Sequence, residues 1–229
     1  MLREDDKPWQ PLIPAEVDAL FAGASFPWWL AGGYAIERAV GRAFRAHEDI
    51  DVMVLHRDHA ALRLMLADWD CWMADPPGTL RPWAVGEAVP PDVHDVWCRR
   101  TPSDPWALQV MFDGAEGDTL VTRRDPRVRL PLSALGSDHC LPPEVQLFYK
   151  AKGVREKDQA DFEAALPVLG EEQRKWLSEV IITAHGDGHV WLGALNRRHP
   201  GLDPGSRVGG PRRKDGRRFA TQDPGSGPG

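Results

Sequence analysis

The sequence predicts an α+β protein: a small mixed or antiparallel sheet flanked by helices, then a helical C-terminal region, then a disordered tail. Three observations support this prediction. Short apolar and β-branched runs separated by Gly, Pro and Asp fill the first half, and amphipathic segments fill the second. From about Pro200 onward apolar residues are nearly absent. We therefore divide the chain into residues 1–136, 137–199 and 200–229.

The first elements surround a pair of glycines. Residues 15–22 have helical spacing, and residues 28–31 form a short apolar run that ends at Gly32 and Gly33, as a buried strand before a turn would. The next helix, residues 34–40, stops at Gly41. Further elements are expected as a strand over 49–55, a helix over 57–69, and strands over 93–99, 107–113 and 119–123.

The second half reads as helices. Residues 141–153 begin a helix at a proline, where the missing N–H costs nothing. Amphipathic segments follow at 157–169, 171–184 and 189–198. The Gly-, Pro- and Arg-rich segment 200–229 cannot bury enough apolar surface to offset its ordering entropy, so we expect a solvated tail rather than a nucleic-acid arm.

Composition limits the function classes. A net charge of -6 argues against a general nucleic-acid binder, and no apolar run approaches membrane-spanning length. The N-terminus is acidic and broken by prolines, unlike a signal peptide. Three widely spaced cysteines form neither a disulfide framework nor a zinc motif, which indicates a reducing, cytoplasmic location.

The chemistry is concentrated in residues 30–58. Asp49 and Asp51 lie two residues apart on a predicted strand, so both carboxylates point to one face and repel unless a cation lies between them. Mg²⁺ suits such a pair, because it binds a few carboxylates and completes its shell with waters and phosphates. Gly32 and Gly33 allow close backbone approach, and the following helix offers free N–H groups to a phosphate. The combination predicts a nucleoside triphosphate site.

The spacing differs from that of the P-loop and of the dinucleotide fingerprint. Instead, "WWLAGGYAIERAVGRAFRAHEDIDVMV" resembles the nucleotidyltransferase superfamily of DNA polymerase β, whose signature is a glycine pair, a helix and h-Asp-h-Asp-h. Within it, the segment is most similar to aminoglycoside and lincosamide nucleotidyltransferases. The matching positions are Trp29, Gly32, Gly33, Tyr34, Ala35, Ile36, Glu37, Gly41, Arg42, Arg45, His47, Asp49 and Asp51.

The resemblance implies transfer of a nucleoside monophosphate, such as AMP from ATP, onto a hydroxyl of a small molecule such as an aminoglycoside-type antibiotic. Asp49 and Asp51 would hold Mg²⁺, and Gly32 and Gly33 would approach the phosphates. Arg42 and Arg45 are candidate phosphate donors, with a solvated loop as the alternative. Lys150, or its neighbours Lys152 and Lys157, would meet the triphosphate from the helical half, although a charged outer face fits equally.

The resemblance also implies a third carboxylate on a neighbouring strand, acting as metal ligand or general base. Here the chain departs from the pattern, because Gln109 occupies the position that the register favours. Asp113 lies on the same face four residues further along, over ten ångströms away at about 3.3 Å per residue. We favour Asp113 as the catalytic carboxylate, with Asp95 as the alternative.

Two other functions keep the same fold. One is a toxin–antitoxin type protein adenylyltransferase, whose acceptor is a protein. The other is a nucleotide-binding module with weakened catalysis, which the neutral Gln109 would explain.

Overall fold

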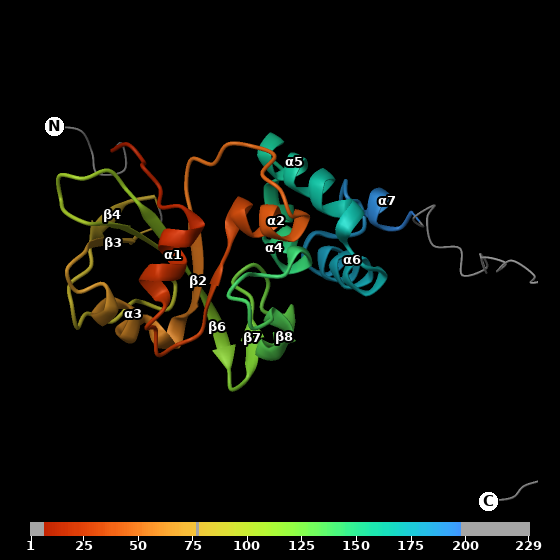
Figure 1. The fold of residues 1–229 in the computed structure, drawn as a ribbon. Coiled ribbons are helices and arrows are strands. Elements are labelled where there is room, and N and C mark those ends of the chain that lie inside the picture. The colour runs from red at the N-terminus through yellow and green to blue at the C-terminus, as the bar shows by residue number, and fades with distance from the viewer. Residues whose placement is uncertain (1–6, 77, 198–229) are drawn as a thin grey trace, which may run out of the picture. The chain divides into compact units, whose positions relative to one another are not determined.

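The computed structural model describes residues 7–76 and 78–197. The eight-stranded sheet runs β1-β2-β6-β5-β3-β4, and β7 and β8 continue it from one end of β6 (Figure 1). The strands are β1 (Trp28–Leu30), β2 (Asp51–Leu55), β3 (Asp70–Ala74), β4 (Leu80–Pro82), β5 (Asp95–Arg99), β6 (Leu108–Glu116), β7 (Thr119–Val121) and β8 (Arg129–Pro131).

The α+β prediction is confirmed, with two corrections of detail. The strand expected over 49–55 begins at Asp51, so Asp49 belongs to the preceding loop. β6 is antiparallel to β5 and β7, as expected for hairpins, but it runs parallel to β2. The parallel register pairs Asp51 with Gln109 and Leu55 with Asp113, which separates Asp113 from Asp51 by the length of β2.

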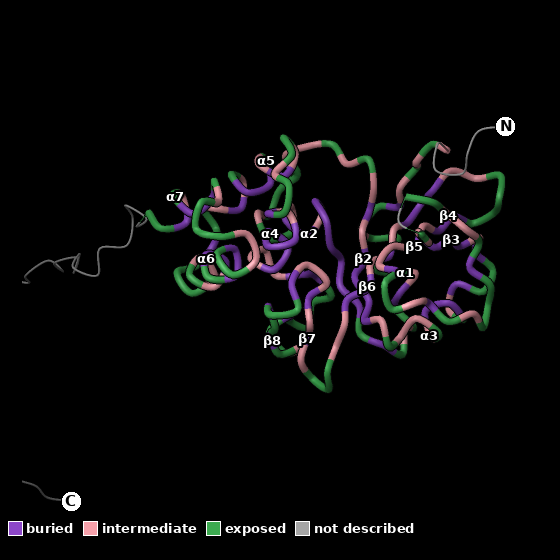
Figure 2. The backbone as a smooth tube through the Cα atoms, turned by 180° about the vertical axis from the view of Figure 1, so that it is seen from behind, coloured by how far each residue is buried: buried purple, intermediate pink, exposed green. Residues whose placement is uncertain are grey.

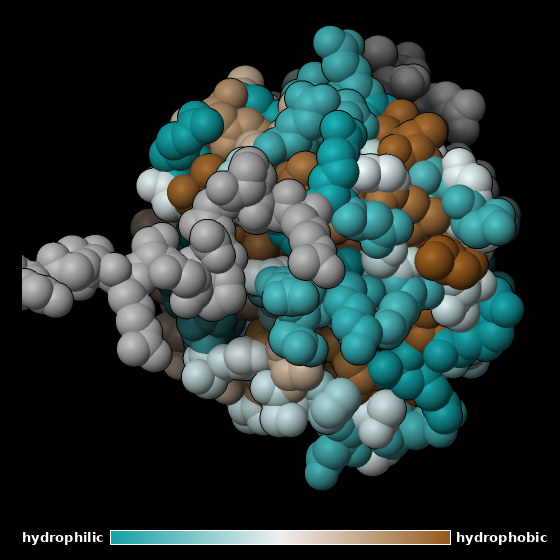
Figure 3. Space-filling model, turned by 90° about the vertical axis from the view of Figure 1, so that its right-hand side faces the viewer, coloured by the Kyte–Doolittle hydropathy of each residue, from teal (hydrophilic) through white to brown (hydrophobic). Residues whose placement is uncertain are grey.

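Helices pack beside this sheet. The first three are α1 (Pro14–Phe21), α2 (Gly32–Val40) and α3 (His59–Met65); the helical half contains α4 (Pro143–Lys150), α5 (Glu156–Ala165), α6 (Glu171–His185) and α7 (Leu192–Leu195). None of the helices in the described part of the chain is both long and apolar enough to span a membrane. The side that carries α6 and α7 is largely hydrophilic, with hydrophobic side chains scattered between polar ones (Figure 3).

Two hydrophobic clusters form the core, and α2 joins them. Ala35 of α2 packs with the sheet residues, whereas Ile36 packs with α4, α5 and α6. In the helical cluster, the rings of Phe162 and Trp191 stack with centroids 4.4 Å apart. Buried backbone follows β2 and β6 through the middle of the molecule (Figure 2). The helix that carries the glycine pair is thus anchored in both halves.

The division at residues 136 and 137 stays a prediction, because the sheet and the helical region belong to the same compact unit. The predicted tail, residues 200–229, lies outside the described residues.

Candidate active site

A cavity of about 480 Å³ lies where the ends of β2, β5 and β6 meet the helical half. Its wall carries both carboxylates and cationic side chains. The lining residues are Gly32, Asp49, Asp51, Ala74, Gly78, Asp92, His94, Asp95, Gln109, Met111, Arg123, Arg124, Gln146, Tyr149, Lys150, Lys152 and Arg155.

Gly32 is the first residue of α2 and lies against Asp51. Its φ of 67° falls in the left-handed region, and a Cβ built at this position would lie 2.2 Å from Asp51 Oδ2. Its N–H donates to Gln146 Oε1 at 2.9 Å, a buried contact with α4. Only glycine lets the backbone approach the carboxylate this closely, so Gly32 and Asp51 form one structural unit.

Gly33 serves a different purpose from the one predicted. It does not line the cavity, and a Cβ at this position would lie 2.1 Å from Arg45 Nη2 and 2.4 Å from His47 Cε1. The missing side chain therefore makes room for the loop that leads to Asp49. Gly33 therefore lies away from the cavity where a phosphate would bind, whereas Gly32 lines it, and the phosphate contact of Gly32 stays a prediction.

Asp49 and Asp51 converge on the cavity although they belong to a loop and a strand. The Ala31 N–H donates to the Asp51 carbonyl oxygen at 2.8 Å, which fixes the start of β2 beside α2. Burial and the charge of Asp49 raise the pKa of Asp51 to about 7, even though Lys150 and Arg123 oppose the shift. Such concentrated negative charge is what a bound cation would relieve.

The donor set fits Mg²⁺ bound together with a nucleotide. Two carboxylates are enough for this ion, since it keeps waters and takes phosphate oxygens for the remaining positions. Within residues 7–76 and 78–197, no group of three or more His, Cys, Asp or Glu side chains is arranged to hold a metal by itself. The substrate phosphates would thus supply part of the coordination shell.

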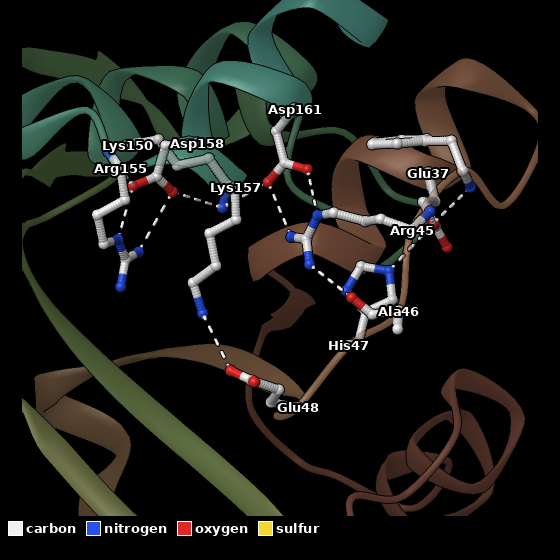
Figure 4. A network of polar contacts seen from close by, with 11 residues as sticks. Glu37, Arg45, Ala46, His47, Glu48, Lys150, Arg155, Lys157, Asp158 and Asp161 are labelled. Carbon is white, nitrogen blue, oxygen red and sulfur yellow. Dashed lines mark hydrogen bonds and ion pairs between the residues drawn. The ribbon is translucent and has the colours of Figure 1, made fainter.

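The loop between α2 and β2 is held by a polar network (Figure 4). Arg45 forms a two-point ion pair with Asp161 of α5, with Nε–Oδ1 and Nη2–Oδ2 distances of 2.7 and 2.9 Å. Glu37 Oε1 accepts the Phe44 N–H at 2.8 Å and lies 3.1 Å from His47 Nε2. These contacts join the first half of the chain to the second and position the loop that presents Asp49.

This network corrects the expectation for the two arginines. Arg45 is occupied by Asp161, and Arg42 is exposed; neither lines the cavity. The loop that follows Gly41 carries Arg45 toward Asp161 of α5 (Figure 4). The predicted phosphate contacts of Arg42 and Arg45 are therefore not supported by the geometry.

Lys150 does line the cavity, at the last turn of α4. Its Nζ lies 2.8 Å from Asp161 Oδ2 and 3.3 Å from Asp158 Oδ1. Burial tends to raise the pKa of Asp161, but the hydrogen bond from Arg45 and the charge of Lys150 lower it overall. Asp161 thus holds both Arg45 and Lys150 in place.

Asp113, favoured from sequence as the third carboxylate, does not line the cavity. It is buried, accepts the Arg123 N–H at 2.6 Å, and pairs with Arg123 Nη1 at 3.0 Å. Burial raises the pKa of Asp113, opposed by the charge of Arg123. Because Arg123 occupies both of its oxygens, this geometry does not support Asp113 as general base. The alternative, Asp95, does line the cavity.

Several residues that line the cavity were not predicted from the sequence. Gln146 is one residue among many in an amphipathic helix, and Arg123 and Arg124 follow a short strand without any recognisable spacing. They join the cavity only because β7 and α4 pack against the end of the sheet. The residues of this kind are Asp92, His94, Arg123, Arg124, Gln146, Tyr149 and Arg155.

Comparison with known proteins agrees with the motif. Residues 15–75 match the sequence model of a family described as aminoglycoside-2''-adenylyltransferase. No curated protein matches the chain. The resemblance to aminoglycoside nucleotidyltransferases drawn from the glycine pair and the two aspartates is therefore confirmed over that segment, and the prediction of a nucleotidyltransferase enzyme agrees with it.

Three solved structures are similar at low identity. The solution structure of the antibiotic-resistance factor ANT(2'')-Ia has 18% identity and a TM-score of 0.49, covering 74% of this chain and 89% of that chain. The lincomycin-bound lincosamide antibiotic adenylyltransferase LnuA has 14% identity and a TM-score of 0.49, with coverages of 70% and 100%. ANT(2'')-Ia in complex with adenylyl-2''-tobramycin has 16% identity and a TM-score of 0.46, with coverages of 72% and 93%. Residues 15–75, which carry Gly32, Asp49 and Asp51, are thus similar in sequence to the aminoglycoside-2''-adenylyltransferase family.

Proposed function

We propose that the protein is a Mg²⁺-dependent nucleotidyltransferase that transfers AMP from ATP onto a hydroxyl of a small molecule, with an aminoglycoside-type antibiotic as the first acceptor to test. The observation that carries this proposal is the convergence of Asp49, Asp51 and the tightly turned Gly32 on a cavity whose wall also supplies cations. The family match of residues 15–75 supports it independently of the cavity.

Asp49 and Asp51 would hold the metal ion. When bound, Mg²⁺ neutralises the triphosphate and the departing pyrophosphate and helps to align the in-line attack. Gly32 would let the nucleotide approach the start of α2 beside Asp51, because no side chain stands between its backbone and that carboxylate. The metal ligands and Gly32 would thus face the same cavity.

The cationic side chains that line the cavity, Lys150, Lys152 and Arg155, would bind the triphosphate oxygens through charge-assisted hydrogen bonds. Lys150 is held in position by Asp158 and Asp161, and Arg155 by Asp158, with Nε–Oδ2 at 2.7 Å. Because these side chains are anchored before the nucleotide binds, little conformational entropy is lost on binding. Lys152 lines the cavity beside them.

Release of pyrophosphate from ATP in the presence of Mg²⁺ and a panel of aminoglycosides and lincosamides tests the proposal. We expect acceptor-dependent release that Asp49→Asn abolishes. Asp68→Asn is the matched control, because it removes one surface carboxylate outside the cavity. If the protein binds MgATP but releases no pyrophosphate with any acceptor in the panel, it is instead a nucleotide-binding module.

A further inference from the structure

The partner of Asp51 across the sheet is the neutral side chain of Gln109. A carboxamide does not take up a proton near neutral pH, so Gln109 cannot serve as general base. Asp113, further along the same strand, is paired with Arg123. β6 thus contributes no available carboxylate to the cavity, and an acceptor hydroxyl needs another proton acceptor.

The neighbouring strand supplies one. β5 pairs antiparallel with β6 so that Trp97 faces Gln109 and Asp95 faces Met111. Paired residues share a face of the sheet, as do residues two apart on one strand, so Asp51, Gln109 and Asp95 all project from the same face. All three line the same cavity.

Gln109 and Asp95 are joined by a hydrogen bond. Gln109 Nε2 donates to Asp95 Oδ1 at 3.1 Å. Because an ionised carboxylate can only accept hydrogen bonds, the amide nitrogen must face it. No hydrogen bond from a described residue reaches Asp95 Oδ2. One oxygen is therefore held in place while the other is left for a ligand in the cavity.

We infer that Asp95 is the general base for the acceptor hydroxyl and that Gln109 is its positioning residue, so that the base comes from β5 and not from β6. The inference rests on the proposed nucleotidyltransferase function. The acceptor O–H bond breaks and its proton passes to Asp95 Oδ2. The acceptor oxygen bonds to the α-phosphorus, and the bond from that phosphorus to the bridging oxygen breaks. The electron pair leaves with pyrophosphate, and Asp95 later returns the proton to solvent.

The distance between Asp95 and Asp51 separates the general base from the metal ligands. Asp95 and Asp51 lie two strands apart, about 10 Å across the sheet at roughly 4.8 Å per strand, and are offset by two residues, about 7 Å, along it. That gap leaves room for a hydroxyl and the α-phosphate between the metal ligands and the base. It also predicts that loss of the Asp95 charge changes turnover and leaves nucleotide binding intact.

Asp95→Asn tests the base directly, because asparagine keeps the shape and its oxygen still accepts from Gln109. We expect kcat to fall by about 10²- to 10⁴-fold, the usual contribution of a positioned general base. The Kd of a non-hydrolysable ATP analogue with Mg²⁺, measured by titration calorimetry, should stay within about twofold. Asp49→Asn should show the opposite signature by losing the Mg²⁺-dependent part of that affinity.

Gln109→Leu tests the positioning role. It should lower kcat less than Asp95→Asn does and leave KM unchanged. The double variant Asp95→Asn/Gln109→Leu should be no slower than Asp95→Asn alone, because residues that act as a unit are non-additive. A further loss in the double variant would show that Gln109 acts independently of Asp95.

A variant that carries the carboxylate on β6 instead of β5 provides a gain-of-function test. The exchange Asp95→Asn/Gln109→Asp returns a carboxylate to β6 and should recover part of the rate lost in Asp95→Asn. If the wild type is active and Asp95→Asn is equally active, the inference about Asp95 is overturned while the proposed function stands. The same holds if Asp95→Asn loses as much MgATP affinity as Asp49→Asn does. A slow His94→Gln beside a fast Asp95→Asn would assign the base to His94, which also lines the cavity. A wild type that binds MgATP but transfers to no acceptor overturns the proposed function and, with it, this inference.

Discussion

Replacing Asp51 by asparagine preserves the size of the side chain and removes a charge that burial and Asp49 make costly. The pKa of Asp51 in the folded protein is about 7, against an ordinary value of 3.8. Since the folded-state pKa is the higher one, the folded protein holds the proton more tightly than the unfolded chain does. The resulting stabilisation is complete below the ordinary value and is lost as pH rises through about 7.

The difference between a pKa of 3.8 and one of about 7 limits the change in the free energy of unfolding to about 4 kcal/mol. For a domain of this length, that limit is equivalent to about 8 to 16 °C in Tm. Asp51 borders a cavity that water can enter, so solvent screening reduces the effect. We therefore expect the metal-free Asp51→Asn variant to melt a few degrees above the wild type at alkaline pH and by a smaller margin at acid pH.

Thermal melts of both proteins in chelator, at about pH 5.5 and about pH 8, measure this difference, and Asp68→Asn controls for the loss of a surface charge. Mg²⁺ added at the higher pH should raise the Tm of the wild type more than that of the variant, since a bound cation stabilises the ionised pair. The reasoning is refuted if the Tm difference between wild type and Asp51→Asn is the same at both pH values, or if Mg²⁺ stabilises both proteins equally.

Three further outcomes are expected. Gly32→Ala should abolish nucleotidyl transfer and lower Tm, because its Cβ would overlap Asp51 Oδ2 and the left-handed φ costs about 1 kcal/mol or more. Normal activity of this variant would contradict the close approach of the Gly32 backbone to Asp51. Arg45→Met should destabilise the fold by about 3 kcal/mol, because it leaves Asp161 buried with one partner fewer. An unchanged midpoint of urea unfolding would contradict the stabilising role of the Arg45–Asp161 ion pair. Deletion of residues 201–229 should leave both Tm and activity unchanged within error, and a drop of several degrees would show that the segment packs.

Local patterns in the sequence were enough to predict most of the elements and to single out Gly32, Asp49 and Asp51, which all line the cavity. A glycine pair between an apolar strand and a helix, followed by two aspartates at a spacing of two, depends only on backbone conformation and side-chain alternation. The strands and helices around it follow from hydrophobic period in the same way. For that reason Gly32, Asp49 and Asp51 were found without knowledge of the fold, although β2 starts two residues later than the pattern indicates.

The partners of those residues depend on contacts between distant segments, which no local pattern encodes. The parallel pairing of β2 with β6 puts Gln109 beside Asp51, and the antiparallel pairing with β5 brings Asp95 to the cavity. Packing of α5 against α2 gives Arg45 to Asp161 instead of to a phosphate. Arg123 reaches Asp113 because β7 folds back on β6. The sequence alone determined which residues are candidates for binding a metal and a phosphate. Strand register and helix packing decided which carboxylate lies beside them, because the neighbours of a charged side chain depend on contacts between distant segments.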